Sequence, residues 1–149
     1  MATGGRLGVE SAAPSTTVRI FRWGALALIA AVLVQAFLGG RGFFLADDDM
    51  LTVHGRVGDA LLLVAIAHVV VGAVAFRRRQ LSRVPLGLSV VLLVLVFVQL
   101  SLGYGSEDSR SAAAWHLPTG VLIFGLAVAN AFLSGAVAWA PPGPPGGAR

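Results

Sequence analysis

The chain is organised around the segment His54-GRVGDALLLVAIAHVVVGAVA-Phe76, an apolar run that opens with a histidine and has a glycine four positions later. A helix advances about 100° per residue, so Gly58 lies on the same helical face as His54, one turn further on. At about 1.5 Å per residue the run is long enough to cross the ~30 Å hydrocarbon core of a bilayer. We therefore interpret it as a transmembrane helix with a histidine near one end.

Similar apolar runs lie on either side, and together they predict an all-α, four-transmembrane-helix bundle. The spans are expected at residues 19–39, 52–76, 84–103 and 113–139, within a membrane domain of residues 18–140. Residues 1–17 and 141–149 are rich in Gly, Ser or Pro and are expected to be disordered tails. A cleavable signal peptide is the alternative for the first run, but no A-x-A-like site follows it.

Composition supports a membrane protein. Hydrophobic residues make up 56% of the 149 residues, charged residues only 12%, and the mean hydropathy is +0.83. Soluble domains have about a quarter of their residues charged. The absence of cysteine excludes disulfides and thiolate metal sites. The net charge of +4 comes from eleven arginines, most of them at the ends of apolar runs, so we do not expect a nucleic acid partner.

The arginines also predict the orientation of the chain. Arg19 and Arg22 precede the first span, and Arg77 to Arg83 form the connection between the second and third spans. Short cytoplasmic loops carry an excess of Lys and Arg. We therefore expect a multi-pass protein of a bacterial cell (inner) membrane with both termini in the cytoplasm, which places His54 and His116 toward the outer face at similar depth.

A repeated pattern indicates two tandem helical hairpins. The pattern V-x-V-Q-x-x-L-G occurs at residues 32–39 and again at 96–103, so Gln35 and Gln99 are 64 residues apart, and His54 and His116 are 62 apart. Parallel repeats of this kind are usually related by an axis along the membrane normal. Such an axis would place the two histidines opposite one another, and likewise the two glutamines.

The helical face below each histidine is mostly small or polar, which is typical of the interior seam between membrane helices. A packing interface alone would also explain the small residues. The two faces are His54, Gly58, Leu61, Ala65, His68, Gly72 and His116, Gly120, Ile123, Ala127, Asn130, Ser134.

Two histidines at equal depth on facing helices are the requirement for bis-histidine ligation of a b-type haem. Gly58 and Gly120 would leave room for a flat group against the backbone. The alternative is that both histidines lie in the interface and are hydrated. Gln35 and Gln99 are expected either to hydrogen-bond the free ring nitrogens of the histidines or to form polar contacts between helices.

Two further polar residues, Arg56 and His68, have two interpretations each. Arg56 is a candidate partner for a haem propionate, or a snorkelling side chain paired with Asp59. His68 lies on nearly the same face as His54, but the matching residue on the fourth span is Asn130, a poor iron ligand. We therefore expect a hydrogen bond between His68 and Asn130 and no second haem.

With these residues in view, the chain resembles one four-helix half of the haem A synthase family over residues 20–138. The resemblance is carried by Gln35-x-x-Leu-Gly, His54-Gly-Arg, Gln99-x-x-Leu-Gly-Tyr and His116-Leu. It implies haem-ligating histidines on the second and fourth helices, which are His54 and His116 here.

The family's glutamate three residues before the first histidine is replaced by Leu51, its loop cysteines are absent and only one half is present. The resemblance therefore does not extend to haem A synthesis, and enzymatic activity stays open. The layout is also similar to that of small, uncharacterised four-helix bacterial membrane proteins.

The sequence thus favours a membrane protein of the lipid bilayer that binds haem b and acts in electron transfer or redox sensing. Its expected partner is a membrane redox protein or a quinone. Both homo-oligomers and hetero-oligomers are compatible with the sequence. The alternative is a non-enzymatic accessory subunit of a larger membrane complex without a cofactor. A transporter or channel is disfavoured because no span is interrupted and no acidic pair lies at mid-membrane.

Overall fold

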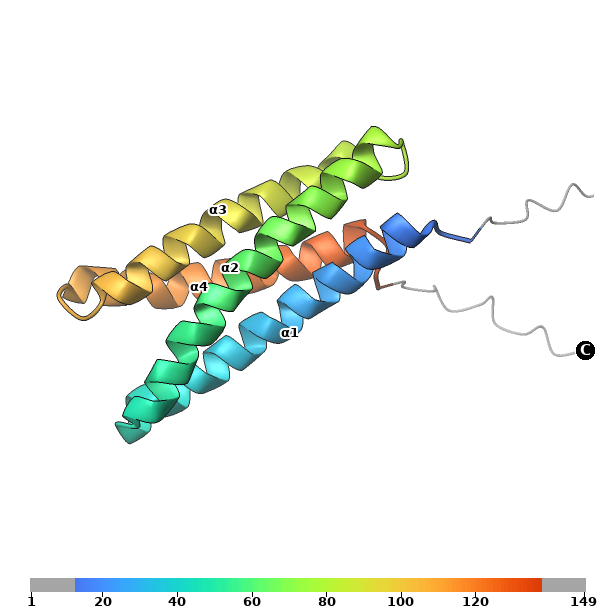
Figure 1. Ribbon diagram of the computed structural model, residues 1–149. Helices are drawn as coiled ribbons and strands as arrows, with labels where there is room; N and C mark the ends of the chain where they lie inside the picture. Colours follow the sequence, from blue (N-terminus) through green and yellow to red (C-terminus); the bar gives the residue numbers. More distant parts are fainter. Residues whose placement is uncertain (1–12, 138–149) are drawn as a thin grey trace, which may run out of the picture.

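The structure, a computed structural model, describes residues 13–137, and over this range it is an all-α bundle of four helices (Figure 1). The helices are α1 (Thr16–Leu45), α2 (Asp48–Arg77), α3 (Arg83–Gly105) and α4 (Arg110–Leu133). Short connections join them, so consecutive helices run in opposite directions. The predicted all-α four-helix bundle is confirmed.

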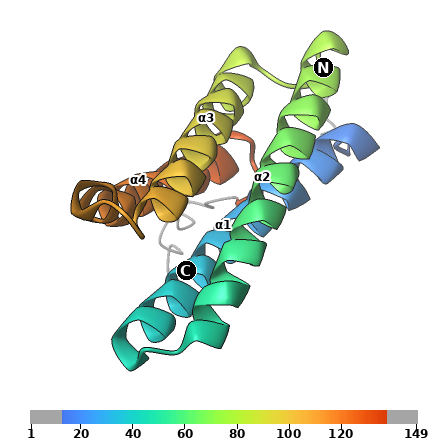
Figure 2. The same ribbon diagram turned by 60° about the vertical axis from the view of Figure 1, so that its left-hand side comes forward.

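The helices form a closed ring in which α1 packs against α2 and α4, and α3 packs against the same two helices. The helices that carry His54 and His116, α2 and α4, therefore lie diagonally across the bundle. The connections at residues 46–47 and 106–109 lie at one end, which we call the hairpin end. The start of α1, the end of α4 and the turn between α2 and α3 lie at the other, the terminal end (Figures 1 and 2).

The interior and the exterior of the bundle are both apolar. The buried core is formed by Leu28, Leu61, Ala65, Leu92, Val96, Ile123 and Ala127. Large apolar side chains also point outward on every helix; Leu63, Phe97 and Leu117 are 68%, 60% and 75% exposed. Helices that are apolar on all sides are expected in a membrane rather than on a water-facing surface. All four helices are long and apolar enough to cross a bilayer, as expected of a multi-pass membrane protein.

The predicted interior faces of α2 and α4 are confirmed. On α2 the buried residues are Gly58, Leu61, Ala65, His68, Gly72 and Ala75. On α4 they are Ile123, Ala127, Asn130 and Ala131, and Ser134 just beyond the helix is also buried. The histidines at the head of each face are half-buried. Helical periodicity therefore identified most of the interior residues of α2 and α4, although Gly120 of the predicted face is only half-buried. The interior residues of α1 and α3, such as Leu28 and Leu92, were not predicted.

The hairpin between α1 and α2 is longer than the expected spans. The helix α1 continues past residue 39 to Leu45, and α2 begins at Asp48 rather than near residue 52. The two helices pack closely here, since a Cβ atom at Gly42 would lie 2.8 Å from Leu51 Cδ2. The reversal is completed by Ala46, with φ of 51°, and by Asp47, whose carboxylate accepts a hydrogen bond from the Met50 backbone N–H at 3.0 Å.

The expectation that the fourth span continues to residue 139 is wrong for the helix, which ends at Leu133. Gly135 has φ of 73°, and the Ala136 N–H donates to the Ala131 carbonyl at 2.9 Å, the pattern of a Schellman C-cap. At the other terminus, residues 16 and 17 of the expected tail are helical, because Ser15 caps α1. Most of that tail, the end of the expected fourth span and all of residues 141–149 lie outside the described residues.

Candidate functional site

The structure brings His54 and His116 together at the hairpin end. Their ring centroids are 6.0 Å apart and their planes are inclined by 72°. Each histidine lies in the second turn of its helix, and the helices are the diagonal pair α2 and α4. The predicted meeting of the two histidines across the bundle is therefore present in the geometry.

Each histidine ring is oriented by a main-chain carbonyl group. His54 Nδ1 lies 3.1 Å from the Gln35 carbonyl oxygen, and His116 Nδ1 lies 3.1 Å from the Gln99 carbonyl oxygen. A carbonyl oxygen can only accept, so in the neutral imidazole Nδ1 carries the proton and Nε2 keeps its lone pair. Metal-ligating histidines commonly donate their second ring N–H in this way, which fixes the tautomer. Both rings therefore offer Nε2 as a ligand.

Two glycines explain why these carbonyl groups are accessible. In an α-helix the carbonyl of residue i points toward residue i+4, and that residue is Gly39 for Gln35 and Gly103 for Gln99. A Cβ atom at Gly39 would lie 2.9 Å from His54 Cε1, and one at Gly103 would lie 3.1 Å from His116 Cε1. The glycine of each Q-x-x-L-G segment thus leaves space for an imidazole ring against the helix backbone.

The glutamine side chains do not bind the histidines, contrary to one of the two expectations. A Cβ atom at Gly58 would lie 2.9 Å from Gln35 Nε2, and one at Gly120 would lie 3.1 Å from Gln99 Nε2. Gly58 and Gly120 therefore accommodate the glutamine amides, and the space expected for a flat group there is occupied by these side chains. The two Oε1 atoms are buried without a hydrogen-bond partner.

Near the histidine pair, Asp59 of α2 contacts a residue of α3 and not Arg56, its expected partner within α2. The Tyr104 hydroxyl donates a hydrogen bond to Asp59 Oδ1 at 2.9 Å. Arg56, for which Asp59 was the alternative partner, is exposed at the hairpin end, two residues from His54. Tyr104 is the last residue of the motif Gln99-x-x-Leu-Gly-Tyr, but its hydrogen bond to Asp59 was not predicted from the sequence. The contact fixes α2 against α3 close to the ring of His116.

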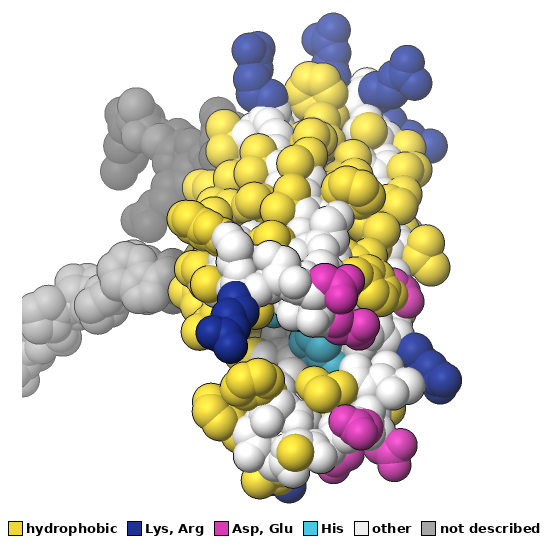
Figure 3. Space-filling view, turned by 90° about the vertical axis from the view of Figure 1, so that its left-hand side faces the viewer, with side chains coloured by type: hydrophobic (Ala, Val, Ile, Leu, Met, Phe, Trp, Pro, Cys, Tyr) yellow, Lys and Arg dark blue, Asp and Glu magenta, His cyan; other side chains and the backbone are white. Residues whose placement is uncertain are grey.

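The hairpin end is hollowed between the two helical hairpins. Figure 3 looks onto this end and shows histidine side chain at the floor of the hollow, with acidic and arginine side chains around it. His54 and His116 are both half-buried, in keeping with this position. A group bound between them would therefore be enclosed by the bundle on one side and be open to the outside of the bundle on the other.

The residues present fit a haem better than a free metal ion. No group of three or more His, Cys, Asp or Glu side chains that could hold a metal ion occurs within residues 13–137. A haem supplies its own four nitrogens and needs only axial ligands. With metal–nitrogen bonds of about 2.0–2.1 Å, two imidazoles on opposite sides of one metal have ring centroids roughly 6–6.5 Å apart. The observed separation of 6.0 Å is close to that range.

The third histidine belongs to a separate polar cluster deeper in the bundle. His68 is 3% exposed and Asn130 is fully buried, and the expected hydrogen bond between them is confirmed, with His68 Nε2 at 3.2 Å from Asn130 Nδ2. Asn130 Nδ2 also donates to Ser89 Oγ at 3.1 Å. The ring of Phe21 stacks on His68 with centroids 4.2 Å apart. Sequence reasoning did not identify Ser89 or Phe21, which lie on other helices.

The direction of each hydrogen bond in this cluster follows from the contact between the Ser89 hydroxyl and the Pro85 carbonyl. Ser89 Oγ donates to the Pro85 carbonyl at 2.8 Å, so it accepts the hydrogen bond from Asn130. The Asn130 amide then directs its second proton to His68 Nε2, which must be unprotonated. The Nε2 lone pair of His68 is thus used within the cluster, whereas those of His54 and His116 have no such partner among residues 13–137.

No protein-family model, curated protein or solved structure matches the chain. The function is therefore inferred from the site itself, whose main features are the paired imidazoles, their tautomer and the hollow that they line.

Proposed function

We propose that this protein is an integral membrane haem b protein in which His54 and His116 are the axial ligands, and that it acts in electron transfer or redox sensing. The observation that carries the proposal is the pair of matched contacts between Nδ1 and a carbonyl oxygen, which leaves both Nε2 atoms free on rings 6.0 Å apart. When bound, a haem supplies a one-electron redox centre.

The residues around the histidines have defined tasks in this proposal. The carbonyl groups of Gln35 and Gln99 hold the two rings in one tautomer and orientation, and they raise the basicity of the ligating nitrogens. Gly39 and Gly103, which have no side chain, leave space for the two rings against α1 and α3. Arg56, exposed beside the hollow, offers a cation to the carboxylate edge of the bound group.

The proposal includes the tandem hairpins and the orientation expected from the sequence. Each hairpin contributes the same set: a glutamine carbonyl, a glycine and a histidine, which supports two related units. The chain would then correspond to one half of the haem A synthase layout, with its termini in the cytoplasm. Haem A synthesis is not proposed, because Leu51 stands at the position of the family's glutamate and packs against Gly42.

The test is the haem content of the purified full-length protein, expressed with excess haem precursor. We expect close to one haem per chain in the wild type and at least about tenfold less in His54→Ala and in His116→Ala, a loss in the range seen for disrupted metal sites. His68→Ala is the matched control, because its Nε2 is bound by Asn130.

Two results would contradict the proposal. A colourless wild-type protein with the helical circular dichroism of a folded bundle would mean that the histidines are interfacial packing residues, which favours an accessory subunit. Equal haem loss in all three variants would show that the histidine pair is not a distinct site.

A further inference from the structure

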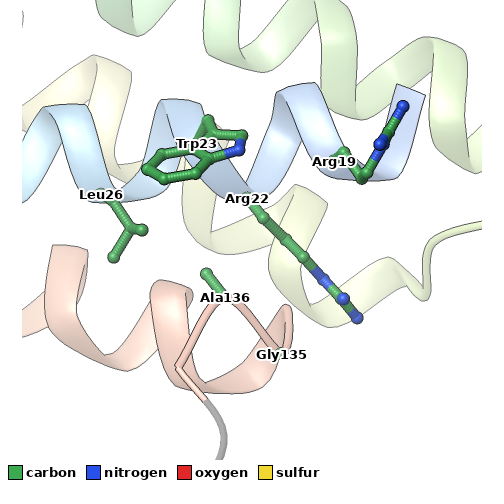
Figure 4. Close-up of a pocket in the computed structure, with 6 residues that line it drawn as sticks. All are labelled: Arg19, Arg22, Trp23, Leu26, Gly135 and Ala136. Carbon is green, nitrogen blue, oxygen red and sulfur yellow. The ribbon is translucent and has the colours of Figure 1, made fainter. Parts of the chain in front are cut away.

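A second hollow lies at the terminal end, far from the histidine pair. It has a volume of about 240 Å³ and lies between the start of α1 and the turn that follows α4. Figure 4 shows Arg22 extending from α1 toward Gly135, with Trp23 and Leu26 on the same helix. The lining residues are Arg19, Arg22, Trp23, Leu26, Gly135 and Ala136.

Arg22 is held in place in this hollow. Its Nε donates to the Ser134 carbonyl oxygen at 2.8 Å, and a Cβ atom at Gly135 would lie 2.7 Å from its Nη2. Glycine at 135 therefore serves two purposes, a positive φ and space for the guanidinium. An arginine has five N–H donors, so most of those of Arg22 are not used by Ser134.

The charge at this end of the bundle is entirely positive within residues 13–137. Six arginines lie here: Arg19, Arg22, Arg77, Arg78, Arg79 and Arg83. Every Asp and Glu of the described chain lies on the half that carries the hairpin end: Asp47, Asp48, Asp49, Asp59, Glu107 and Asp108. Arg19 and Arg22 are three positions apart on α1, where like charges repel. An anion between them would remove this repulsion.

The other wall of the hollow is apolar. Trp23 is exposed and Leu26 half-buried, and they follow the arginines toward the middle of the membrane. Tryptophan is enriched where a transmembrane helix crosses the lipid interface. A ligand that fits this arrangement has a negative head near the arginines and an apolar chain along Trp23 and Leu26.

We propose that this hollow binds an anionic phospholipid, with its phosphate at Arg19 and Arg22 and an acyl chain along Trp23 and Leu26. The carbonyl groups at the end of α4 partly balance the charge of Arg22, so the phosphate lies toward Arg19. Anionic lipids attract basic segments beside transmembrane helices. The site shares no residue with the histidine pair, so it does not depend on the proposed haem.

The test is native mass spectrometry of the full-length protein titrated with phosphatidylglycerol or with phosphatidylcholine of the same acyl chains. We expect tight binding of phosphatidylglycerol only. Replacing Arg19 and Arg22 by Gln should weaken it roughly fivefold for each arginine. The matched control is the pair Arg77→Gln and Arg79→Gln, which removes the same charge from the same end and should change the affinity less than twofold.

Equal weakening by the two pairs of substitutions would overturn the site in favour of a diffuse basic surface, and equal binding of the two lipids would overturn the role of charge. Competition by millimolar inorganic phosphate to the same extent as by lipid would identify a free anion as the ligand and contradict the lipid. A second measurement leaves both arginines in place and so does not depend on the folding of the arginine variants. In a Trp115→Phe, Trp139→Phe background, brominated phosphatidylglycerol should quench the fluorescence of Trp23 more than brominated phosphatidylcholine does.

Discussion

The three histidines of this chain differ in what each ring nitrogen contacts. All three are assigned the proton on Nδ1, but for different reasons. In His54 and His116 a carbonyl oxygen accepts from Nδ1, and Nε2 makes no hydrogen bond to the described part of the chain. In His68 the Asn130 amide donates to Nε2, and Nδ1 is buried without a partner. A neutral histidine binds a metal through its unprotonated ring nitrogen. That nitrogen is occupied by Asn130 in His68 and is available in His54 and His116, so depth in the bundle alone does not identify the ligands.

Adding one methyl group at Gly39 should disturb the ring of His54, whereas the same change on an open helix surface should not. Gly39→Ala places a Cβ atom 2.9 Å from His54 Cε1, so the ring must move away from the Gln35 carbonyl. We expect haem affinity to fall about 10–100-fold, as for other losses of support to a metal ligand. The measurement is haem retention during competition with apomyoglobin.

The neighbouring Gly40 provides the control, because a Cβ atom there would meet nothing within 4 Å. Gly40→Ala should retain haem like the wild type. If both variants lose haem equally, the effect comes from the helix backbone and the proposed role of Gly39 is incorrect.

At the scale of the helices, the interior of the bundle was predictable from the sequence because it depends on periodicity. Gly58, Leu61 and Ala65 follow the helical repeat from His54, and all three are buried. Ile123 and Ala127 do the same on α4. Small and polar residues stand out against a background of Val, Leu and Phe, so the helical face that they share could be read without knowing any contact.

Contacts that depend on the approach of two backbones could not be predicted in this way. The extension of α1 through Gly42 depends on Leu51 of the next helix. The role of the Gln35 and Gln99 carbonyl groups is not visible in residue types, since every residue has a carbonyl. The glycine four residues after each glutamine was the available signal, and it was interpreted only as part of a repeat.

The cluster of His68, Asn130 and Ser89 should couple helices α2, α3 and α4 energetically. Asn130→Ala leaves His68 Nε2 without its donor. In a double-mutant cycle with His68→Ala we expect a coupling free energy of about 0.6 kcal/mol and at most about 1.7 kcal/mol, the average and the maximum found for polar contacts between membrane helices. The measurement is unfolding in SDS followed by circular dichroism.

Asn130→Ala combined with His116→Ala is the control cycle. Residues 116 and 130 are roughly 21 Å apart along α4, so their effects should add. Additivity in the His68 cycle as well would mean that the hydrogen bond between His68 and Asn130 contributes nothing to stability.

On the scale of the whole molecule, the two hairpins differ in length and the two ends differ in charge. Helices α1 and α2 each have 30 residues, roughly 45 Å, and exceed a ~30 Å hydrocarbon core. Helices α3 and α4, with 23 and 24 residues, match it more closely. His54 is the seventh residue of α2 and His116 the seventh of α4, and the two rings lie side by side, so the additional length of α2 lies toward the terminal end. The acidic residues lie on the half that carries the hairpin end, whereas the terminal end carries only arginine among its described charged residues.

This charge asymmetry predicts which end faces the cytoplasm. The chain contains no cysteine, so single cysteines report their own position without background. In intact cells, a membrane-impermeant maleimide should label Glu107→Cys at the hairpin end and leave Gln80→Cys at the terminal end unlabelled. Both native side chains are exposed. Labelling of Gln80→Cys alone would reverse the topology and move the proposed haem site to the cytoplasmic side.

The central claim is that His54 and His116 ligate the same iron, and it is tested most directly by adding carbon monoxide to the reduced, detergent-purified protein. With both axial positions taken by histidine, the wild type should show a narrow α-band and no change in the Soret band. His54→Ala or His116→Ala, in whatever haem it retains, should respond to carbon monoxide through the opened position. A wild type that is colourless, or whose Soret band shifts with carbon monoxide as in the variants, would contradict bis-histidine ligation.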